Sequence, residues 1–149
     1  WSNWLQAHPE TLAMTNGYAQ TSLARQTFDT DFVIGVVISD LSKAYFYEDV
    51  AAEGLLNDQL GEFPLLIWAA HNDYRTYLRQ VGDQTLSFEA LEGNSDLLKD
   101  RETGSTWEAN LGLATAGPLK GEALQPAPSL TSFDWAWEDF YPNSEYYHP

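Results

Sequence analysis

The longest apolar run of the chain, Phe32-Val-Ile-Gly-Val-Val-Ile38, is short and rich in β-branched residues. A helix that spans a bilayer needs roughly 18 to 20 apolar residues, so the sequence predicts no direct membrane insertion. A run of this length that is dominated by Val and Ile is typical of a buried β-strand. The run therefore predicts a domain built around strands.

Further short segments with apolar or alternating patterns follow this run and are separated by turn-forming residues. The expected strands are Phe32–Ile38, Lys43–Tyr47, Phe63–Ala69, Tyr74–Gln80, Thr85–Ala90 and Asp96–Lys99. The dipeptide Gly82-Asp83 predicts a β-hairpin, because its residues favour a tight turn between strands. One short helix is expected over Glu48–Leu56, whereas residues 106–128, with many Gly, Ala and Pro, are expected to be irregular with at most short strands.

These elements predict a mostly β fold, with α+β as the alternative. We expect a compact antiparallel sheet or a barrel-like domain with one or two short helices. The length of 149 residues suits one domain, since a chain of this size buries roughly two-thirds of its unfolded surface. A hydrophobic content of 44% argues against disorder despite the net charge of −15.

The two ends of the chain contain similar segments. Trp4-Leu-Gln-Ala-His-Pro-Glu-Thr11 and Trp137-Glu-Asp-Phe-Tyr-Pro-Asn-Ser144 share a Trp, a Pro and a closing hydroxyl at the same spacing. Either the similarity is a coincidence in a Trp-rich chain, or both segments close a domain of the same kind. On the second interpretation, residues 1–28 are a linker or the tail of a preceding unit, and residues 29–149 form a single β-rich domain.

Charge and cysteine content exclude several function classes. With 22 acidic residues against 7 Lys and Arg, nucleic acid is not an expected partner, because phosphate binding needs clustered cations. The absence of Cys excludes disulfides, thiolate metal sites and cysteine nucleophiles. An acidic, Lys-poor chain that begins with Trp rather than Met is expected to be a processed product or a segment of a longer polypeptide, located outside the cytoplasm in the periplasm or extracellular space.

An ordered set of short motifs resembles a known family. The motifs are Val33-Ile-Gly-Val, Lys43-Ala-Tyr, Glu53-Gly-Leu-Leu-Asn-Asp58, Phe63-Pro-Leu-Leu-Ile, Asp100-Arg-Glu-Thr-Gly-Ser-Thr-Trp107, Gly117-Pro-Leu-Lys-Gly-Glu-Ala-Leu124 and Trp135-Ala-Trp137 with Pro142. Together, over roughly residues 30–145, they resemble a domain-of-unknown-function family found in exported bacterial and archaeal proteins. The resemblance implies the fold and an exported location, and it carries no established activity.

The chain departs from that family at one place. Relatives usually have a pair of cysteines after the apolar strand, where this chain has Trp68-Ala-Ala-His-Asn-Asp-Tyr74. A thiolate metal site or a redox pair is therefore not expected here.

Polar residues that follow the expected strand at Phe63–Ala69 are candidates for a site. His71 and Asp73 could bind a metal ion, but neighbours so close in sequence seldom converge on one ion without distant ligands. The alternative is an exposed His beside a turn-forming Asn-Asp pair. Ser105 with His71 and an Asp would form only a nominal triad, because a chain with 22 acidic residues offers many such combinations.

The segment from Asp100 to Ser105 combines charges and hydroxyls. Asp100 with Asp96 could act as an acid–base pair if burial separated their pKa values. The structural interpretation is that Arg101 pairs with a buried carboxylate, that the hydroxyls of the segment satisfy turn backbone groups, and that Trp107 covers the cluster. His71, Asp73, Asp100, Arg101 and Ser105 are thus candidate ligand-binding residues.

The aromatic residues near the C-terminus form a second candidate surface. Phe133-Asp-Trp-Ala-Trp137 alternates and is expected to be a strand with two indoles on one face. If Trp135 and Trp137 are exposed, they would suit a sugar ring or a protein partner; if they are buried, they simply close the core.

The leading hypothesis from the sequence is a non-enzymatic, exported structural or interaction module. It would be a subunit of a larger extracellular or membrane-attached assembly, with other protein subunits as partners. The alternatives are a ligand-binding, metal-binding or hydrolytic domain with a carboxylate-lined pocket, and a polysaccharide-binding domain that uses exposed Trp. No catalytic residue, metal or cofactor is assigned, and enzymatic activity is left open.

Overall fold

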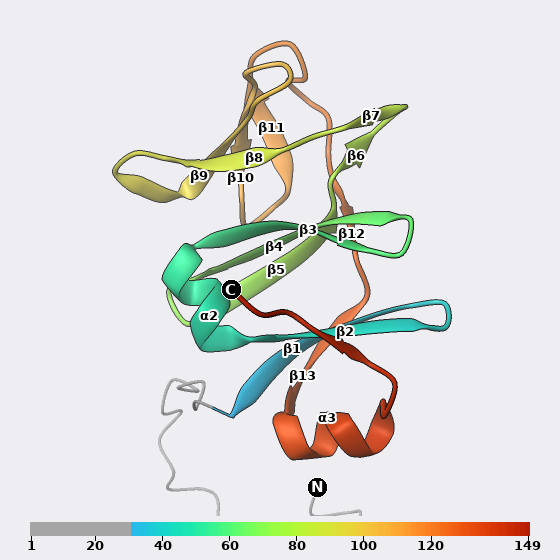
Figure 1. Cartoon of the computed structure of the whole chain (residues 1–149). Helices are drawn as coiled ribbons and strands as arrows, with labels where there is room; N and C mark the ends of the chain where they lie inside the picture. Colours follow the sequence, from blue (N-terminus) through green and yellow to red (C-terminus); the bar gives the residue numbers. More distant parts are fainter. Residues whose placement is uncertain (1–30) are drawn as a thin grey trace, which may run out of the picture.

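The computed structural model of the chain describes residues 31–149 (Figure 1). The expected linker or tail over residues 1–28, with the segment Trp4–Thr11, lies outside the described residues.

Three four-stranded sheets make up most of the described part of the chain. The first sheet has the order β13-β1-β2-β14, the middle sheet β12-β5-β4-β3, and the third sheet β11-β10-β9-β8. The strands of the first sheet are β1 (Phe32–Ile38), β2 (Leu41–Phe46), β13 (Ser129–Phe133) and β14 (Glu145–Tyr146). Those of the middle sheet are β3 (Leu55–Leu60), β4 (Phe63–Ala70), β5 (Asp73–Leu78) and β12 (Gln125–Pro126). Those of the third sheet are β8 (Phe88–Leu91), β9 (Asn94–Asp100), β10 (Thr106–Glu108) and β11 (Leu113–Ala116).

Three small elements complete the fold. The strands β6 (Gln80–Val81) and β7 (Gln84–Thr85) form the hairpin predicted at Gly82-Asp83. The helix α2 (Tyr47–Glu53) connects β2 to β3, and α3 (Asp134–Phe140) follows β13. No helix in residues 31–149 combines the length and apolar character that a membrane span requires.

The sheets are stacked, with the middle sheet between the other two and α3 beneath the first (Figure 1). Side chains of the first sheet, such as Ile34 and Tyr45, pack against Leu65 and Ile67 of β4 in one core. The opposite face of β4 contributes Leu66 and Trp68 to a second core shared with the third sheet. The middle sheet is therefore buried on both faces, which explains why β4 is a continuous apolar run rather than an alternating one.

A third and smaller core lies between the first sheet and α3. Trp137 of α3 is 1% exposed and packs against Val33 and Ala44. Its six-membered ring lies so close to Gly35 of β1 that no Cβ would fit there. The expected strand over Phe133–Trp137 is therefore wrong, because this segment turns into a helix that inserts one Trp against a glycine of the sheet.

The mostly β fold predicted from the sequence is confirmed, and nearly all strand pairs are antiparallel, with the pairing of β14 and β2 parallel. None of the sheets in residues 31–149 closes into a barrel. The helix expected over Glu48–Leu56 is shorter than predicted. Gly54 ends it with a φ of 79°, a conformation that suits glycine, and Leu55 already belongs to β3.

Candidate functional site

A pocket of about 450 Å³ lies at the edge of the middle sheet, beside β5. We call it the Arg75 pocket. Its lining residues are Asp73, Tyr74, Arg75, Thr76, Tyr77, Asn110, Leu111, Pro126, Ala127 and Ser129.

The pocket exists because β5 is covered along only part of its length. The strand β12 pairs with β5 at Leu78 and Tyr77, and Ala127 then donates its backbone N–H to Thr76 O. Beyond that point the chain leaves the middle sheet and continues into β13 of the first sheet. Within residues 31–149 no strand pairs with the first residues of β5 on that side, and their side chains line the pocket.

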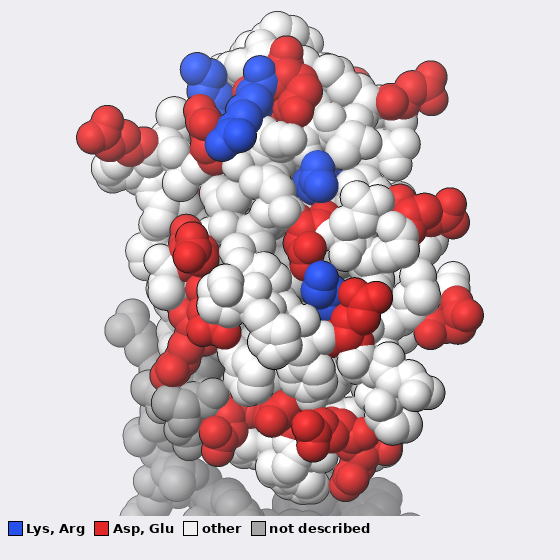
Figure 2. All heavy atoms as spheres, in the orientation of Figure 1, with Lys and Arg blue, Asp and Glu red and all other residues white. Residues whose placement is uncertain are grey.

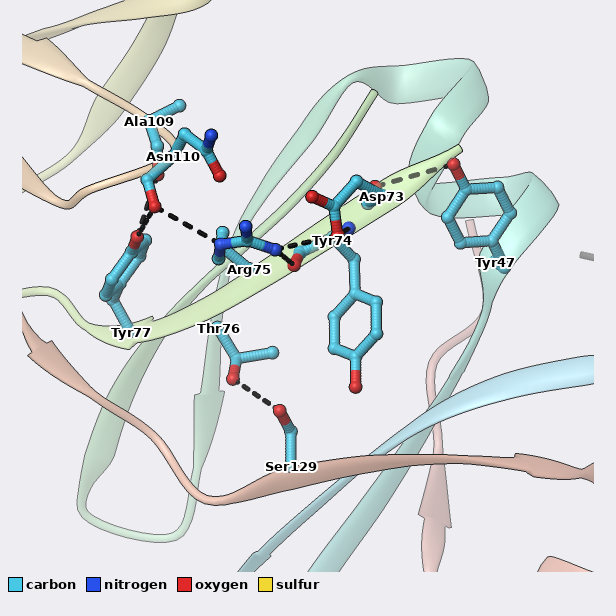
Figure 3. Close-up of polar contacts among 9 residues, drawn as sticks. All are labelled: Tyr47, Asp73, Tyr74, Arg75, Thr76, Tyr77, Ala109, Asn110 and Ser129. Carbon is cyan, nitrogen blue, oxygen red and sulfur yellow. Dashed lines mark hydrogen bonds and ion pairs between the residues drawn. The ribbon is translucent and has the colours of Figure 1, made fainter. Parts of the chain in front are cut away.

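The guanidinium of Arg75 is oriented by three acceptors (Figure 3). Its Nη1 donates to Asp73 Oδ1 at 2.7 Å and to the carbonyl oxygen of Tyr74 at 2.6 Å. Its Nε donates to the carbonyl oxygen of Asn110 at 3.2 Å. These contacts fix the plane of the guanidinium, whereas Nη2 makes no hydrogen bond within residues 31–149.

The loop that carries Asn110 is held by a buried tyrosine. The hydroxyl of Tyr77 shares its one proton between the carbonyl oxygens of Ala109 and Asn110, at 2.9 and 3.0 Å. Burial raises the pKa of Tyr77 to about 12, so the hydroxyl keeps its proton and remains a donor at neutral pH. On the other side of the pocket, the Thr76 hydroxyl donates to the carbonyl oxygen of Ala127 at 2.8 Å and lies 2.8 Å from Ser129 Oγ, from which it can accept. The pocket wall is therefore built from elements of three separate segments.

Of the candidate ligand-binding residues, Asp73 alone lines this pocket. Asp100 and Ser105 are fully buried in and beside β9 of the third sheet. Arg101 bonds Glu89 at 3.2 Å, and both side chains are more than half exposed. The structure thus gives Arg101 an exposed partner rather than the buried carboxylate expected from the sequence, and it does not bring Asp73, Asp100 and Arg101 together.

Asp100 lies at the centre of a closed hydrogen-bond network. Its Oδ2 accepts bonds from Trp107 Nε1 at 2.8 Å and from the Thr103 hydroxyl at 2.9 Å, and its Oδ1 accepts one from Thr103 N at 2.6 Å. Thr103 Oγ1 is 2.7 Å from Ser105 Oγ, which accepts a bond from Leu119 N. Because these polar atoms are paired with one another, the network offers no open group to a ligand.

His71 is in an exposed turn between β4 and β5. Its Nε2 is 3.1 Å from Asp96 Oδ1 and 3.3 Å from Ser95 Oγ. A Ser-His-Asp relay needs the acid and the serine on opposite nitrogens of the imidazole, whereas here both contact the same one. Within residues 31–149 there is no group of three or more His, Cys, Asp or Glu side chains that could hold a metal ion.

The two candidate tryptophans have opposite environments. Trp137 is buried, and its Nε1 donates to Ser144 Oγ at 2.9 Å. Trp135 is 65% exposed and stacks on Phe133, with centroids 6.3 Å apart and planes inclined by 16°. Phe133 in turn packs on Phe32, with centroids 4.4 Å apart. We call Phe32, Phe133 and Trp135 the aromatic row.

The free edge of the first sheet is a surface that the sequence did not indicate. Val37 donates its N–H to Pro128 O, and Asp134 donates to Asp31 O. In an antiparallel ladder, residues that bond the partner strand alternate with residues whose N–H and C=O point away from it. Pro128 and Asp134 bond β1 and its extension directly, so in this register every second residue between them does so too. Thr131 is one of the residues in between, and its N–H and C=O point away from β1. No hydrogen bond of residues 31–149 reaches them. We call this outer side of β13, from Ser129 to Phe133, the β13 edge.

Sequence reasoning also missed Arg75 and Asn110, since the two residues are 35 positions apart and neither belongs to a motif. For the β13 edge, the one signal that could have been used is that residues 129–133 carry no charge and no Pro.

Comparison with known proteins gives one match. A family model described as "Protein of unknown function (DUF3179)" matches residues 22–144 of the chain. The searches of curated proteins and of solved structures give no significant match. The resemblance to a domain-of-unknown-function family is confirmed, whereas the pair of cysteines expected in relatives stays a prediction.

Proposed function

Since this chain belongs to the DUF3179 family of proteins of unknown function, we propose a function from its own geometry: it is a non-enzymatic interaction module. The partner is another protein subunit, and an extended segment of that subunit adds to the first sheet as a strand along the β13 edge. The observation that carries the proposal is the outer edge of β13, which has no charged side chain and no strand partner within residues 31–149 and lies beside the aromatic row.

An open strand edge is a ready template for another strand. Natural proteins usually protect such edges with charged side chains, with Pro or with a bulge. The sequence of β13, Ser-Leu-Thr-Ser-Phe, contains no charged residue and no Pro. The strand also has no bulge, because its register with β1 runs without a shift from Ser129 to Phe133. Strand addition would satisfy the N–H and C=O of Thr131, which face outward.

The side chains beside the edge supply apolar contact area. Leu130 and Phe133 are both about two-fifths exposed, at 41% and 42%. Trp135 continues the row from the first turn of α3. Aromatic rings give large contact areas at interfaces for a small loss of conformational entropy.

The charges around the edge indicate the chemistry of the partner. Acidic side chains spread over the face shown in Figure 2 and gather at the end of the molecule where α3 lies. The helix itself carries the exposed Glu138 and Asp139. A partner segment with Lys or Arg flanking its strand would be attracted to this end and could place a cation over the Trp135 ring. A second copy of the chain, itself at −15, would be repelled.

We place this module outside the cytoplasm, as part of a larger extracellular or membrane-attached assembly. The acidic, Lys-poor and Cys-free composition supports this location, because excess carboxylates keep a protein soluble in salty or acidic surroundings. Fractionation of the producing cells, with detection of the chain in each fraction, tests the location.

The strand-addition proposal is tested by selecting peptides from a random displayed library on the purified chain. We expect the selected peptides to combine Lys or Arg with alternating β-branched residues. Their binding should be lost in Thr131→Pro, which removes the outward N–H, and retained in the matched variant Thr131→Val, which keeps it. A sheet edge tolerates Pro where the N–H faces solvent. Peptides that bind Thr131→Pro as tightly as the natural chain would overturn the proposal.

A further inference from the structure

We propose that the Arg75 pocket binds a neutral polyhydroxylated molecule of the size of a mono- or disaccharide. This inference does not depend on strand addition at β13, because it rests on the polar groups and the shape of the pocket beside β5.

Three polar groups of the pocket are open to a ligand. Asp73 Oδ2, Arg75 Nη2 and the side-chain amide of Asn110 make no hydrogen bond within residues 31–149, whereas Asp73 Oδ1, Arg75 Nη1 and Nε and the Asn110 carbonyl oxygen are bonded. Asn110 and Arg75 are neighbours in space, since the Asn110 carbonyl oxygen accepts from Arg75 Nε (Figure 3). The open groups therefore belong to residues that line the same pocket.

The order of donors and acceptors suits hydroxyl groups. Asp73 Oδ2 can only accept, Arg75 Nη2 can only donate, and the Asn110 amide offers both. A hydroxyl both donates and accepts, so neighbouring hydroxyls of a sugar can give a proton to Asp73 while accepting one from Arg75. The bonds that already hold the guanidinium limit the conformational entropy lost on binding.

Charge favours a neutral ligand. The Asp73 carboxylate and the Arg75 guanidinium are paired at 2.7 Å, so the pocket presents one charge of each sign side by side. An anion would meet Asp73 and the net charge of −15, and a cation would meet Arg75. A zwitterion would have to replace the existing ion pair between Asp73 and Arg75 with two new ones. Because both side chains are partly exposed, such ion pairs would add little to the binding free energy.

The pocket also has an apolar wall for the C–H face of a sugar ring. Leu111 is 62% exposed beside Asn110, and both Leu111 and Pro126 line the pocket. The volume of about 450 Å³ is within the range of small-molecule sites, roughly 300 to 1,000 Å³.

The test is an NMR titration of the ¹⁵N-labelled chain with glucose, galactose, mannose and maltose, alongside glycine, glutamate and choline. We expect at least one neutral saccharide to give saturable shifts at Asn110, Leu111 and the Arg75 side chain. Shifts of similar size and affinity with glycine, glutamate or choline would overturn the neutral-ligand proposal. The absence of saturable shifts at these residues with every saccharide would overturn the site.

Variants distinguish binding from folding. In Asn110→Ala we expect saccharide affinity to fall about threefold to tenfold, the loss of one hydrogen bond. The unfolding midpoint should stay unchanged, because the side-chain amide makes no hydrogen bond within residues 31–149. Leu111→Ser should weaken binding in the same direction. Asn143→Ala, which alters an exposed Asn after α3, is the matched control and should bind as the natural chain does. Equal affinity in Asn110→Ala and Asn143→Ala would contradict the role of the amide.

Discussion

Trp107 donates its indole Nε1–H to Oδ2 of Asp100 at 2.8 Å, and neither side chain is exposed to solvent. An ionised carboxylate is stable in such a place only when hydrogen bonds replace its lost hydration. Thr103 supplies two more of these bonds. The segment that the sequence offered as a candidate site therefore fixes the β9–β10 turn of the third sheet.

We predict that Asp100→Asn destabilises the fold by about 2 to 3 kcal/mol, because the introduced NH₂ would face groups that are themselves donors. Urea unfolding followed by fluorescence measures the change. Asp83→Asn, in the exposed β6–β7 turn, is the control and should change stability by less than about 0.5 kcal/mol. Equal stability of the two variants would mean that the buried network does not support the fold.

The Asp100 carboxyl also makes the free energy of unfolding depend on pH. Burial by itself raises the pKa of Asp100, but the hydrogen bonds from Trp107 and Thr103 outweigh it and hold the pKa below its usual value. The unfolded chain, with an Asp pKa of about 3.9, then binds the proton more readily. The stabilisation of the fold by the ionised Asp100 is therefore complete above the pKa of the unfolded chain, and it is lost as the pH falls through the lower pKa of the folded state.

We expect the natural chain to lose stability more steeply below about pH 4 than Asp100→Asn, as measured by urea midpoints across pH. Parallel curves for the two proteins would contradict this assignment.

The close packing of Trp137 on Gly35 predicts a second stability effect. In Gly35→Ala the new methyl group would overlap the indole ring, and overpacking of this kind lowers stability by about 1 to 3 kcal/mol. Thermal unfolding monitors the change. In the double variant Gly35→Ala with Trp137→Phe, the smaller ring leaves room for the new methyl group and should recover part of the lost stability. The effects of the two substitutions on the free energy of unfolding should therefore not be additive. Strict additivity would show that the two residues do not touch.

Trp135 and Trp137 differ in exposure, and their substitutions should differ accordingly. Trp137→Ala removes a ring that is 1% exposed and should destabilise by about 3 to 5 kcal/mol. Trp135→Ala removes a ring that is 65% exposed and should change stability by less than about 0.5 kcal/mol. Acrylamide quenching provides a second readout, because only Trp135→Ala removes an accessible indole. Comparable destabilisation by both substitutions would argue against the described environment of α3.

Local patterns in the sequence were sufficient for part of the fold. The apolar runs at β1 and β4 and the dipeptide Gly82-Asp83 each specify an element through nearby residues alone, and the structure has all three. The α3 segment was misread because Phe133, Trp135 and Trp137 alternate as in a strand, while the helix is too short for a helical period to emerge. What selects the helix is the contact of Trp137 with Gly35, a residue far away in the sequence.

The candidate site was less predictable for the same reason. The sequence indicated which residue types carry chemistry, but it could not show that Asp100 is enclosed by Trp107 and Thr103. Nor could it show that Arg75 reaches the loop at Asn110, because that proximity depends on how the third sheet packs on the middle one. Asp73 alone among the candidates lines the pocket.

Amide hydrogen exchange at Thr131 tests the proposed strand addition most directly. In the free chain, the Thr131 N–H points away from β1 and should exchange much faster than the amides of Leu130 and Ser132, which face β1 in the alternating ladder. Binding of a selected peptide should slow Thr131 and leave its two neighbours unchanged. Slow exchange of Thr131 in the free chain, or no added protection when the peptide is bound, would contradict the account.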